Sequence, residues 1–370
     1  MSLFQKKQTS YLGVDIGAHG IKLVEFKQSK NRPQLWTYGI THESTNIHAG
    51  AFGGNETNDA TLTASGEHGD TSDEQAKKFG LWLKDLVKKS KATTTTAIAS
   101  LPVSYIFHTL VTLPESDKKR ITQLVRAEVT KFLPRPIEEM QITHQVIPQT
   151  KIEKQKKYVR VLVTAAPKFL IQFYTKIFQY AGLQLTELET EAFALTRSFI
   201  GKDQSTAMIV DIGAERSNFF IIDQGLPMTT RSIQIGGNHF GKIIDNTLGI
   251  ETAMSKQVKY DLSSFGPNKV DPTLFQEPLG AMIKEIQYNF DVFLRQVGNE
   301  GKRPEKIILT GGSAVIPAIQ ERLQKEFPMK VFIGDPWARV VYQERLKQRL
   351  DIIGPRMSVS IGLAMRNILG

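Results

Sequence analysis

The sequence predicts an α/β protein built from two similar halves. Three observations support this class: the chain has 370 residues, it repeats one five-residue motif, and strand-like hydrophobic runs alternate with helix-like segments. A chain of this length exceeds what one hydrophobic core usually organises, so two domains are expected. The motif Val-Asp-Ile-Gly-Ala stands at 14–18 and again at 210–214. Each copy ends a hydrophobic run, so both halves are predicted to begin with the same strands.

The composition is that of a globular protein with a basic surface. Hydrophobic residues make up 41% and charged residues 23% of the chain, and the formal net charge is +10. The basic residues are scattered, and the densest runs, at 84–91 and 151–160, are typical of solvated helix and loop faces. We therefore expect no nucleic-acid partner, while attraction to an anionic membrane surface stays open.

Several classes of protein are excluded. The chain has no cysteine, which rules out disulfides and thiolate zinc sites. No apolar run is long enough to span a bilayer, and the N-terminal residues do not resemble a signal peptide. These features are typical of a cytoplasmic protein.

The first half is expected to open with a hairpin and continue as strand, loop, helix and strand. Apolar and polar residues alternate on both sides of a glycine turn, which predicts the hairpin. A later stretch rich in Gly, Asn and Thr has little apolar content, which predicts a mobile loop. Apolar residues at helical spacing, from Phe79 to Val87, predict the helix. The expected ranges are a hairpin at 11–26, a strand at 37–44, a mobile loop at 46–69, a helix at 73–89 and a strand at 93–102.

Residues 103–165 are predicted to form a module of their own. A strand at 103–114 leads into a helix at 116–134, which the prolines at 134 and 136 are expected to stop. An antiparallel pair of strands follows at 140–149 and 157–166. The apolar side of the predicted helix carries Ile121, Leu124, Val125, Val129 and Phe132. After the module we expect a helix at 168–180 that is capped by Gly182.

The second half repeats this pattern. Three strands joined by short glycine turns are expected across 206–236, and a long helical region at 239–298 is predicted to break near 263–272. A strand at 305–314 runs into a Gly-Gly turn, and a helix closes the chain from residue 355 onward. These boundaries suggest a first domain at 1–195 and a second at 196–370.

The repeated turn has the chemistry of a phosphate site. An Asp-x-Gly turn after a buried strand presents backbone N–H groups, and glycine allows a phosphate to approach them. The carboxylate would bind Mg²⁺ or its waters, and the metal would bridge to phosphate oxygens. Two such turns facing one another would clamp a triphosphate. The turn at 310–313 leads toward a helix whose N-terminus suits an anion or a ribose.

The order of DIGAHGIK, DIGAERSN, LTGGSAVIP and IGLAMRN resembles the actin-like ATPase superfamily. This resemblance implies a duplicated, ribonuclease H-like fold that binds ATP and Mg²⁺. Asp15 and Asp211 would hold the metal through water. The implied nucleotide-binding residues are Asp15, Gly17, Ala18, His19, Gly20 and Lys22 in the first phosphate loop, Asp211, Gly213, Ala214, Arg216, Ser217 and Asn218 in the second, and Gly311, Gly312 and Ser313 beside the nucleoside.

Within this superfamily the chain resembles the PilM family of type IV pilus proteins. The segments that carry the likeness are VDIGAHGIKLVEF, LPVSYIFHTLVTLPE with RAEVTKFLPRPIEEM, LETEAFALTR and DQGLPMTTRSIQIGG. The resemblance implies a cytoplasmic scaffold at the inner face of the inner membrane, with 103–165 as an FtsA/PilM-type inserted subdomain. That subdomain would bind the N-terminal peptide of a PilN-like membrane protein in a nucleotide-dependent way. Other pilus platform proteins and the assembly ATPase are further partners implied by the family, and any membrane attachment is expected to come through partners.

The chain departs from the superfamily in its first phosphate loop. Ala18, His19 and Gly20 stand where small hydroxyl residues are usual, which puts nucleotide affinity and turnover in question. Glu191 stands in the segment that connects the domains and is the candidate catalytic residue, while Gly362 lies in the second connection, a hinge helix at 356–370. At most slow ATP hydrolysis is expected. The alternatives are an active ATPase or phosphotransferase related to sugar kinases, or an FtsA-like filament-forming protein.

Overall fold

The computed structural model describes residues 10–29, 32–41, 69–148, 157–249 and 273–369. The chain divides into two compact units. Unit 1 comprises Met1–Leu101, Phe169–Ser198 and Asp335–Gly370, and unit 2 comprises Pro102–Lys168 and Phe199–Gly334. Most of the predicted loop at 46–69 and the predicted break at 263–272 lie outside the described residues. The domain boundaries expected from the sequence stay a prediction.

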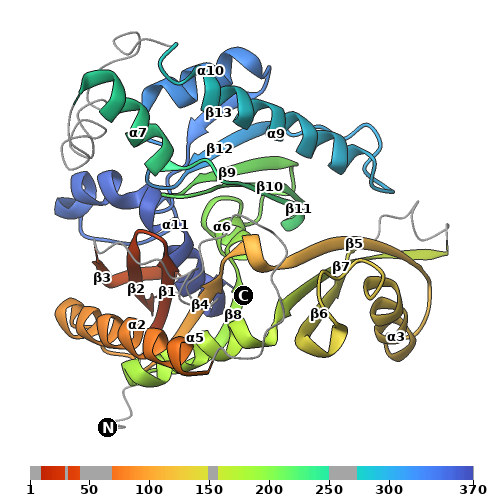
Figure 1. The fold of residues 1–370 in the computed structure, drawn as a ribbon, viewed down its shortest axis with the longest axis horizontal. Helices are drawn as coiled ribbons and strands as arrows, with labels where there is room; N and C mark the ends of the chain where they lie inside the picture. The colour runs from red at the N-terminus through yellow and green to blue at the C-terminus, as the bar shows by residue number, and fades with distance from the viewer. Residues whose placement is uncertain (1–9, 30–31, 42–68, 149–156, 250–272, 370) are drawn as a thin grey trace, which may run out of the picture. The chain divides into compact units, whose positions relative to one another are not determined.

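Unit 1 is built on a five-stranded sheet (Figure 1). Its strands lie in the order β3-β2-β1-β4-β8, in which β1, β2 and β3 are antiparallel neighbours and β4 and β8 run parallel to β1. The predicted hairpin is confirmed by the β1–β2 pair, whereas β3 begins before residue 37. The strand bounds are β1 Ser10–Gly17, β2 Gly20–Ser29, β3 Arg32–Ile40, β4 Thr96–Leu101 and β8 Gln184–Thr190.

Helices pack on this sheet and supply most of the core of unit 1. Helix α11 lies along β1 and β2, and its Met357 and Ile361 pack with Phe26 and the fully buried Trp337. The helix predicted from residue 355 in fact begins earlier, and Pro355 lies inside it. Gly182, at φ +73°, ends α5 as predicted. The helix bounds are α2 Gly69–Ser90, α5 Lys168–Ala181, α6 Glu191–Phe199, the 3-10 turn η3 Glu344–Leu346 and α11 Lys347–Leu369.

Unit 2 contains a second sheet with the topology of the first. Its order, β11-β10-β9-β12-β13, repeats the pattern of three antiparallel strands followed by two parallel ones. The strand β9 that ends in the second Val-Asp-Ile-Gly-Ala copy therefore occupies the place of β1, and the predicted duplication is confirmed. The strand bounds are β9 Ala207–Ile212, β10 Ser217–Asp223, β11 Leu226–Ile233, β12 Lys306–Thr310 and β13 Lys330–Ile333.

The strands of this sheet read as nearly continuous apolar runs because helices cover them. Phe219, Phe220, Ile221 and Ile222 follow one another in β10, and all four are fully buried, as expected for a strand that is covered on both faces. Helix α9 packs along β10 and β11, and α10 packs on β13. The helix bounds are α7 Gly237–Leu248, α9 Gln276–Leu294 and α10 Pro317–Glu326.

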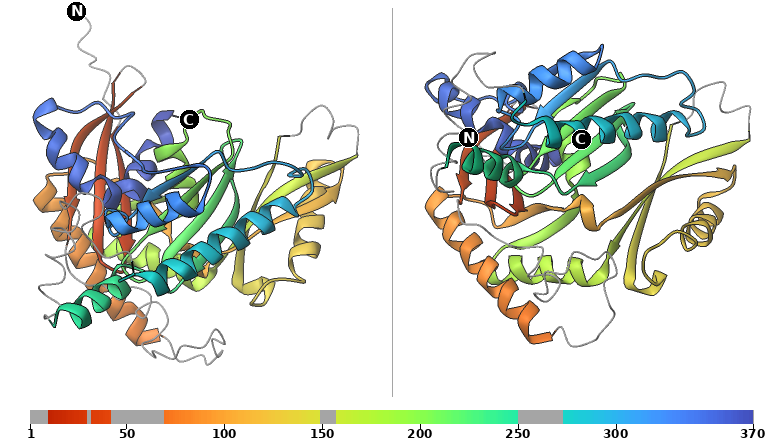
Figure 2. Two further views of the ribbon diagram at one scale, coloured as in Figure 1. Left: turned by 90° about the horizontal axis from the view of Figure 1, so that it is seen from above. Right: turned by 45° about the horizontal axis from the view of Figure 1, so that its top comes forward.

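The predicted module is a three-stranded sheet, β5-β7-β6, with one helix against it (Figure 2). Val125 and Val129 of α3 pack on Val161 and Val163 of β7. Two details differ from expectation: residues 103–105 form a 3-10 turn rather than strand, and α3 ends at Val129, before the prolines. The bounds are η1 Val103–Tyr105, β5 Phe107–Pro114, α3 Lys118–Val129, η2 Ile137–Glu139, β6 Met140–Val146 and β7 Tyr158–Pro167.

The early end of α3 overturns the prediction for Phe132. Beyond Val129 the chain no longer follows the helical period, so Phe132 leaves the apolar side and is 59% exposed.

The module itself lies between β4 and β8 in the chain but belongs to unit 2. There Arg160, fully buried in β7, donates to Asn299 Oδ1 at 3.1 Å. His108 of β5 bonds the Pro227 carbonyl at 2.8 Å.

Candidate functional site

In unit 1 the segment predicted as the first phosphate loop is the tight turn between β1 and β2. Gly17 pairs with Gly20 across the turn, and Asp15 pairs with Lys22 two residues earlier. The predicted residues Ala18 and His19 form the tip and are half-buried. Thr41 fixes the turn from the side, because its hydroxyl oxygen accepts from the Ile21 N–H at 2.8 Å. All six residues predicted for this loop therefore lie together on one hairpin.

The carboxylate of Asp15 is buried and is compensated by the chain itself. Lys22 Nζ lies 3.2 Å from Asp15 Oδ2, and Ser100 at the end of β4 donates to Asp15 Oδ1 at 3.4 Å. Both partners are held by the sheet, since β2 and β4 flank β1. The negative charge expected to recruit Mg²⁺ thus has an ammonium beside it.

Glu191 lies at the carboxyl edge of the same sheet. It follows β8 directly and is the first residue of α6, where a carboxylate also favours the helix dipole. Because β4 separates β1 from β8, the two strands are about 10 Å apart. Asp15 and Glu191 are therefore two strands apart along one edge of the sheet, where ligands bind in open α/β sheets.

Behind Glu191, helix α6 crosses α11 at very short range. A Cβ on Gly362 would overlap the Ala194 carbonyl oxygen and would lie 2.8 Å from Ser198 Oγ. Arg197 of α6 donates from Nε to the Gly362 carbonyl at 2.9 Å. The two segments predicted to connect the domains are therefore packed directly on one another within unit 1.

Ion pairs join this crossing to β8. Arg197 pairs with Glu189, and Arg366 of α11 pairs with Glu189 at 2.5 Å and also with Glu187. Burial, and after it the charge of Arg366, lowers the pKa of Arg197. The charge of Glu187 raises the pKa of Arg197, and the ion pairs tie β8, α6 and α11 into one assembly.

In unit 2 the second phosphate loop and the Gly-Gly turn meet at one edge of the sheet. Strands β9 and β12 are parallel, and Asp211 is level with Thr310 at their carboxyl ends. Gly311 has φ +90°, and a Cβ there would lie 2.5 Å from Asp211 Oδ1. Only glycine meets both conditions. The turn is held in place by the Ser313 N–H, which donates to the Ile212 carbonyl at 3.2 Å.

A third glycine turn joins this edge, and sequence reasoning did not identify it as part of the site. Gly237 and Asn238 open α7, and their N–H groups donate to the carbonyls of Gly213 and Ala214 at 2.8 and 2.7 Å. A Cβ on Gly237 would overlap the Ser313 hydroxyl. The signal was present as a Gly-Gly pair between a strand and a helix, the arrangement that brings a helix N-terminus to an anion.

The surroundings of Ser217, and of Glu215 and Arg216 beside it, could not be predicted from the sequence. Ser217 is fully buried and donates its hydroxyl to the Ile235 carbonyl at 2.6 Å, so the structure gives it a role in holding the turn. Tyr105 of η1 lies within electrostatic range of Glu215 and Arg216. Burial raises the pKa of Tyr105, while Arg216 lowers it and Glu215 raises it.

The duplicated hairpins differ in the residue that lies opposite the aspartate. In β1–β2 the residue opposite the aspartate is Lys22, whereas in β9–β10 the residue opposite Asp211 is Asn218. An ammonium neutralises a carboxylate, and an amide does not. The second aspartate is also half-buried rather than buried, so it is the better placed of the two to meet a solvated cation.

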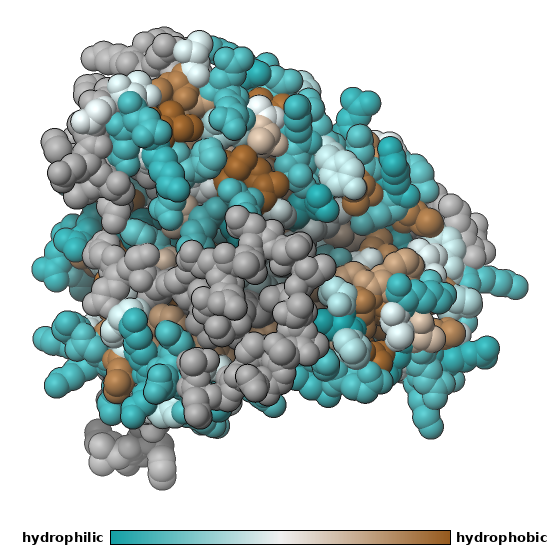
Figure 3. Space-filling view, viewed as in Figure 1, coloured by the Kyte–Doolittle hydropathy of each residue, from teal (hydrophilic) through white to brown (hydrophobic). Residues whose placement is uncertain are grey.

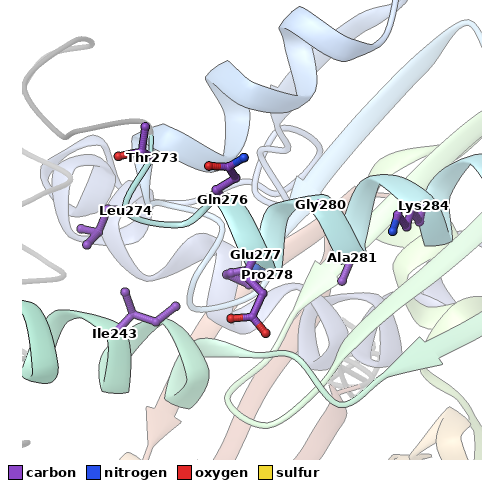
Figure 4. Close-up of a pocket in the computed structure, with 9 residues that line it drawn as sticks. All are labelled: Ile243, Thr273, Leu274, Gln276, Glu277, Pro278, Gly280, Ala281 and Lys284. Carbon is purple, nitrogen blue, oxygen red and sulfur yellow. The ribbon is translucent and has the colours of Figure 1, made fainter.

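A cavity of about 840 Å³ lies elsewhere in unit 2, between the first turns of α9 and helix α7 (Figure 4). Its polar side chains include Glu277 and Lys284, and Ile243 closes one side. None of the residues predicted from the sequence lines it. The lining residues are Ile243, Thr273, Leu274, Gln276, Glu277, Pro278, Gly280, Ala281 and Lys284.

The carboxylates of Asp15 and Asp211 fit a metal ion whose other ligands are mostly waters and phosphate oxygens. Among the residues described, no group of three or more His, Cys, Asp or Glu side chains could hold a metal ion by itself. Mg²⁺ at nucleotide sites takes one or two carboxylates and completes its shell with waters and phosphate oxygens. A single aspartate in each loop fits that mode.

None of the described helices is long and apolar enough to cross a membrane.

Solved structures with a similar fold cover almost the whole chain. The PilM-PilN type IV pilus biogenesis complex contains a chain that matches with a TM-score of 0.74 at 20% identity, over 98% of this chain and 99% of that chain. The ethanolamine utilization protein EutJ from Carboxydothermus hydrogenoformans matches with a TM-score of 0.51 at 15% identity, over 99% and 92%. These likenesses show the fold, and the predicted actin-like α/β fold is confirmed.

Curated relatives cover part of the chain. The cell division protein FtsA of Streptococcus pneumoniae is 24% identical over 197 residues, and FtsA of Bacillus subtilis is 20% identical over 195 residues. The matches take in 48% and 47% of this chain, and they span 43% and 44% of those relatives, under half their length. The family model described as type IV pilus assembly protein PilM matches residues 13–368. The chain therefore belongs to the PilM family of type IV pilus assembly proteins.

Proposed function

We propose that this chain is an Mg–ATP-binding scaffold of type IV pilus assembly that holds the N-terminal peptide of a PilN-like protein. Family membership supports the assembly role, and the solved PilM-PilN complex supports the partner. The observation that carries nucleotide binding is the edge of the unit 2 sheet, where the turn at Gly311 lies against Asp211 and the turn at Gly237 packs on Gly213 and Ser313. The proposed place of action is the cytoplasmic face of the inner membrane, reached through the partner.

The chemistry of that edge suits a nucleotide phosphate. Helix α7 begins at Gly237 with its dipole directed toward the second phosphate loop, and a helix N-terminus favours negative charge. Asp211 would hold a water of the Mg²⁺ shell, and the metal would offset the phosphate charge. In unit 1, Lys22 would exchange its pairing with Asp15 for a phosphate oxygen. The glycines at 311 and 312 would face the nucleoside.

Calorimetry of Mg–ATP binding tests this proposal. We expect Asp211→Ala to weaken binding at least tenfold, since it removes the carboxylate that holds the metal shell, and Asp291→Ala to leave binding unchanged. Asp291 is exposed on α9, and its replacement by alanine removes the same charge from the same unit. Equal affinity of both variants and the wild type, or no heat of binding in the wild type, would refute the nucleotide site.

Nucleotide dependence of peptide binding has a candidate route through Tyr105. This residue lies in the segment that leads from β4 into the inserted module, and it is close enough to Glu215 and Arg216 for their charges to act on it. In this proposal, a rearrangement of the second phosphate loop would act on the start of the module through the charges of these two residues. Coupling requires that ATP favour one of two states.

The test is peptide affinity with and without Mg–ATP. We expect ATP to change the affinity of the PilN-like peptide in the wild type, and Tyr105→Phe to reduce that change while leaving the ATP affinity itself intact. Asp211→Ala should abolish the effect of ATP on the peptide. The same peptide affinity in every combination would remove coupling from the proposal and would leave the scaffold role standing.

Hydrolysis is proposed to be slow at most, with Glu191 as the residue that orients water. Its place at the carboxyl edge of the unit 1 sheet supports this role. Steady-state phosphate release should be slow in the wild type and slower in Glu191→Gln. Turnover near the median enzyme rate of about 10 s⁻¹ would favour an active ATPase instead.

A further inference from the structure

We infer that the outer face of α2 binds an anionic lipid surface. Helix α2 of unit 1 turns its inner side to the sheet, where Phe79, Leu83 and Leu86 are buried. Its outer side carries a cluster of lysines around two hydrophobic side chains. In Figure 3 the surface over α2, at the lower left, is mostly hydrophilic with a hydrophobic patch among the polar side chains. Lys77, Lys78, Lys84, Lys88 and Lys89 of α2, and Lys91 directly after its end, are all exposed.

The charge of this face is strongly one-sided. Against the six lysines stand Glu74 and Asp85, so the face has a net charge of 6 − 2 = +4. Asp85 is paired with Lys89 at 2.7 Å, and Asp73 on the flank of the helix is paired with Lys176 at 2.7 Å. Glu74 is then the acid left on this face, and one negative charge does not balance the five other lysines. A helix that is merely solvated usually mixes both signs along its face.

The hydrophobic residues lie at the centre of the lysines. Leu81 is 51% exposed, and its helical neighbours three and four residues away are Lys77, Lys78, Lys84 and Asp85. Trp82 is half-buried with its ring edge against Phe79, at 5.6 Å between centroids, and Lys78 Nζ lies 4.9 Å from the Trp82 ring. A single exposed leucine is ordinary. A leucine and a tryptophan on a helix face rich in lysine match the composition of helices that lie at a bilayer interface.

A lipid surface fits this face better than nucleic acid does. The lysines lie on a rigid, convex helix rather than around a groove, and a flat anionic surface meets all of them together. Each lysine near such a surface strengthens binding by roughly fivefold. Four net charges therefore give a weak, salt-sensitive attachment that would orient the protein when another contact already holds it at the membrane. The inference does not depend on ATP binding or on the peptide.

Vesicle sedimentation of the full-length protein tests the inference. We expect binding to vesicles of phosphatidylglycerol and phosphatidylcholine, none to pure phosphatidylcholine, and a marked loss as salt rises toward ~0.15 M, where the Debye length is about 8 Å. Lys77→Gln/Lys88→Gln should weaken binding roughly 25-fold, at fivefold for each charge. The control, Lys119→Gln/Arg126→Gln, removes two exposed charges from α3 and should bind as the wild type does.

Tryptophan emission provides a second measurement. The chain has three tryptophans, and Trp337 is buried, so Trp36→Phe leaves Trp82 as the reporter that lipids can reach. Brominated lipids should quench its emission, and adding Trp82→Phe should remove that quenching. Equal losses in the α2 and α3 variants would assign binding to net charge and overturn the inference. Absence of quenching, or displacement of the vesicles by RNA at lower concentration than by anionic lipid, would overturn it as well.

Discussion

The crossing of α6 and α11 gives opposite expectations for the same substitution at two helical glycines. Gly362 in α11 faces the Ala194 carbonyl, and a Cβ would lie 2.5 Å from the Ala194 carbonyl carbon. Gly280 in α9 has nothing within 4 Å of the same position. Replacing glycine by alanine within a helix normally stabilises it by about 1 kcal/mol. Gly280→Ala should show that gain.

Gly362→Ala should instead be destabilising. Carbon atoms pack at about 3.5 Å, so the helices would have to separate by about 1 Å. The obstacle is backbone, which cannot rotate away. Overpacking costs about 3 kcal/mol at the upper end of its usual range, and the gain in helix propensity offsets about 1 kcal/mol. The expected net loss is about 2 kcal/mol, and the hydrogen bond from Arg197 to the Gly362 carbonyl is strained in addition.

Thermal unfolding and urea unfolding, both followed by circular dichroism, measure both variants. For a unit of 150–250 residues, 1 kcal/mol shifts the melting temperature by about 2–4 °C, so Gly362→Ala should melt about 4–8 °C below the wild type and Gly280→Ala slightly above it. If Gly362→Ala matched Gly280→Ala, the close crossing in unit 1 would be refuted. An unchanged m value in both variants would show that the comparison concerns stability rather than compactness.

Three further predictions concern polar groups that are buried or half-buried. Lys22→Met should destabilise the protein by about 1–3 kcal/mol, because it leaves the buried Asp15 carboxylate without its cation; adding Asp15→Asn should recover most of the loss in a double-mutant cycle, and additive effects would contradict the pairing. Burial lowers the pKa of His108 to about 4 from an ordinary value of 6.5, so the unfolded chain binds the proton first. Stability should therefore be complete above pH 6.5 and fall by about 3 kcal/mol toward pH 4; the same pH profile in His108→Gln would exclude this residue as the cause. Arg160→Met should cost about 1–3 kcal/mol and make the inserted module more sensitive to proteolysis, whereas an exposed control, Arg120→Met, should change neither.

The two predicted phosphate loops differ in the residue that faces the aspartate of each hairpin. Both end a buried strand with the same five residues, yet Lys22 faces the aspartate in one and Asn218 faces it in the other. In the proposed nucleotide site, the first loop would therefore bring a cation to a phosphate, and the second would bring an anion to a metal. This proposed division of roles would follow from the residue opposite the aspartate in each hairpin.

The sequence by itself determined the elements that depend on local order. The hairpin at 11–26, the helix that ends at Gly182 and the repeat of the three-strand unit were predicted, because alternation, helical spacing and turn residues act between near neighbours. The residues of each phosphate loop were predicted for the same reason, since they are contiguous. Helix ends were less certain: α3 stops at Val129, and α11 continues through Pro355.

Only the tertiary structure decided which distant segments meet. It grouped the module at 102–168 with unit 2, brought the turn at Gly237 to the second phosphate loop, and placed Lys22 on Asp15. These contacts depend on how closely two backbones approach and on where buried charges find partners. Neither is encoded in the spacing of residues along one segment, because each requires a surface that another part of the chain provides.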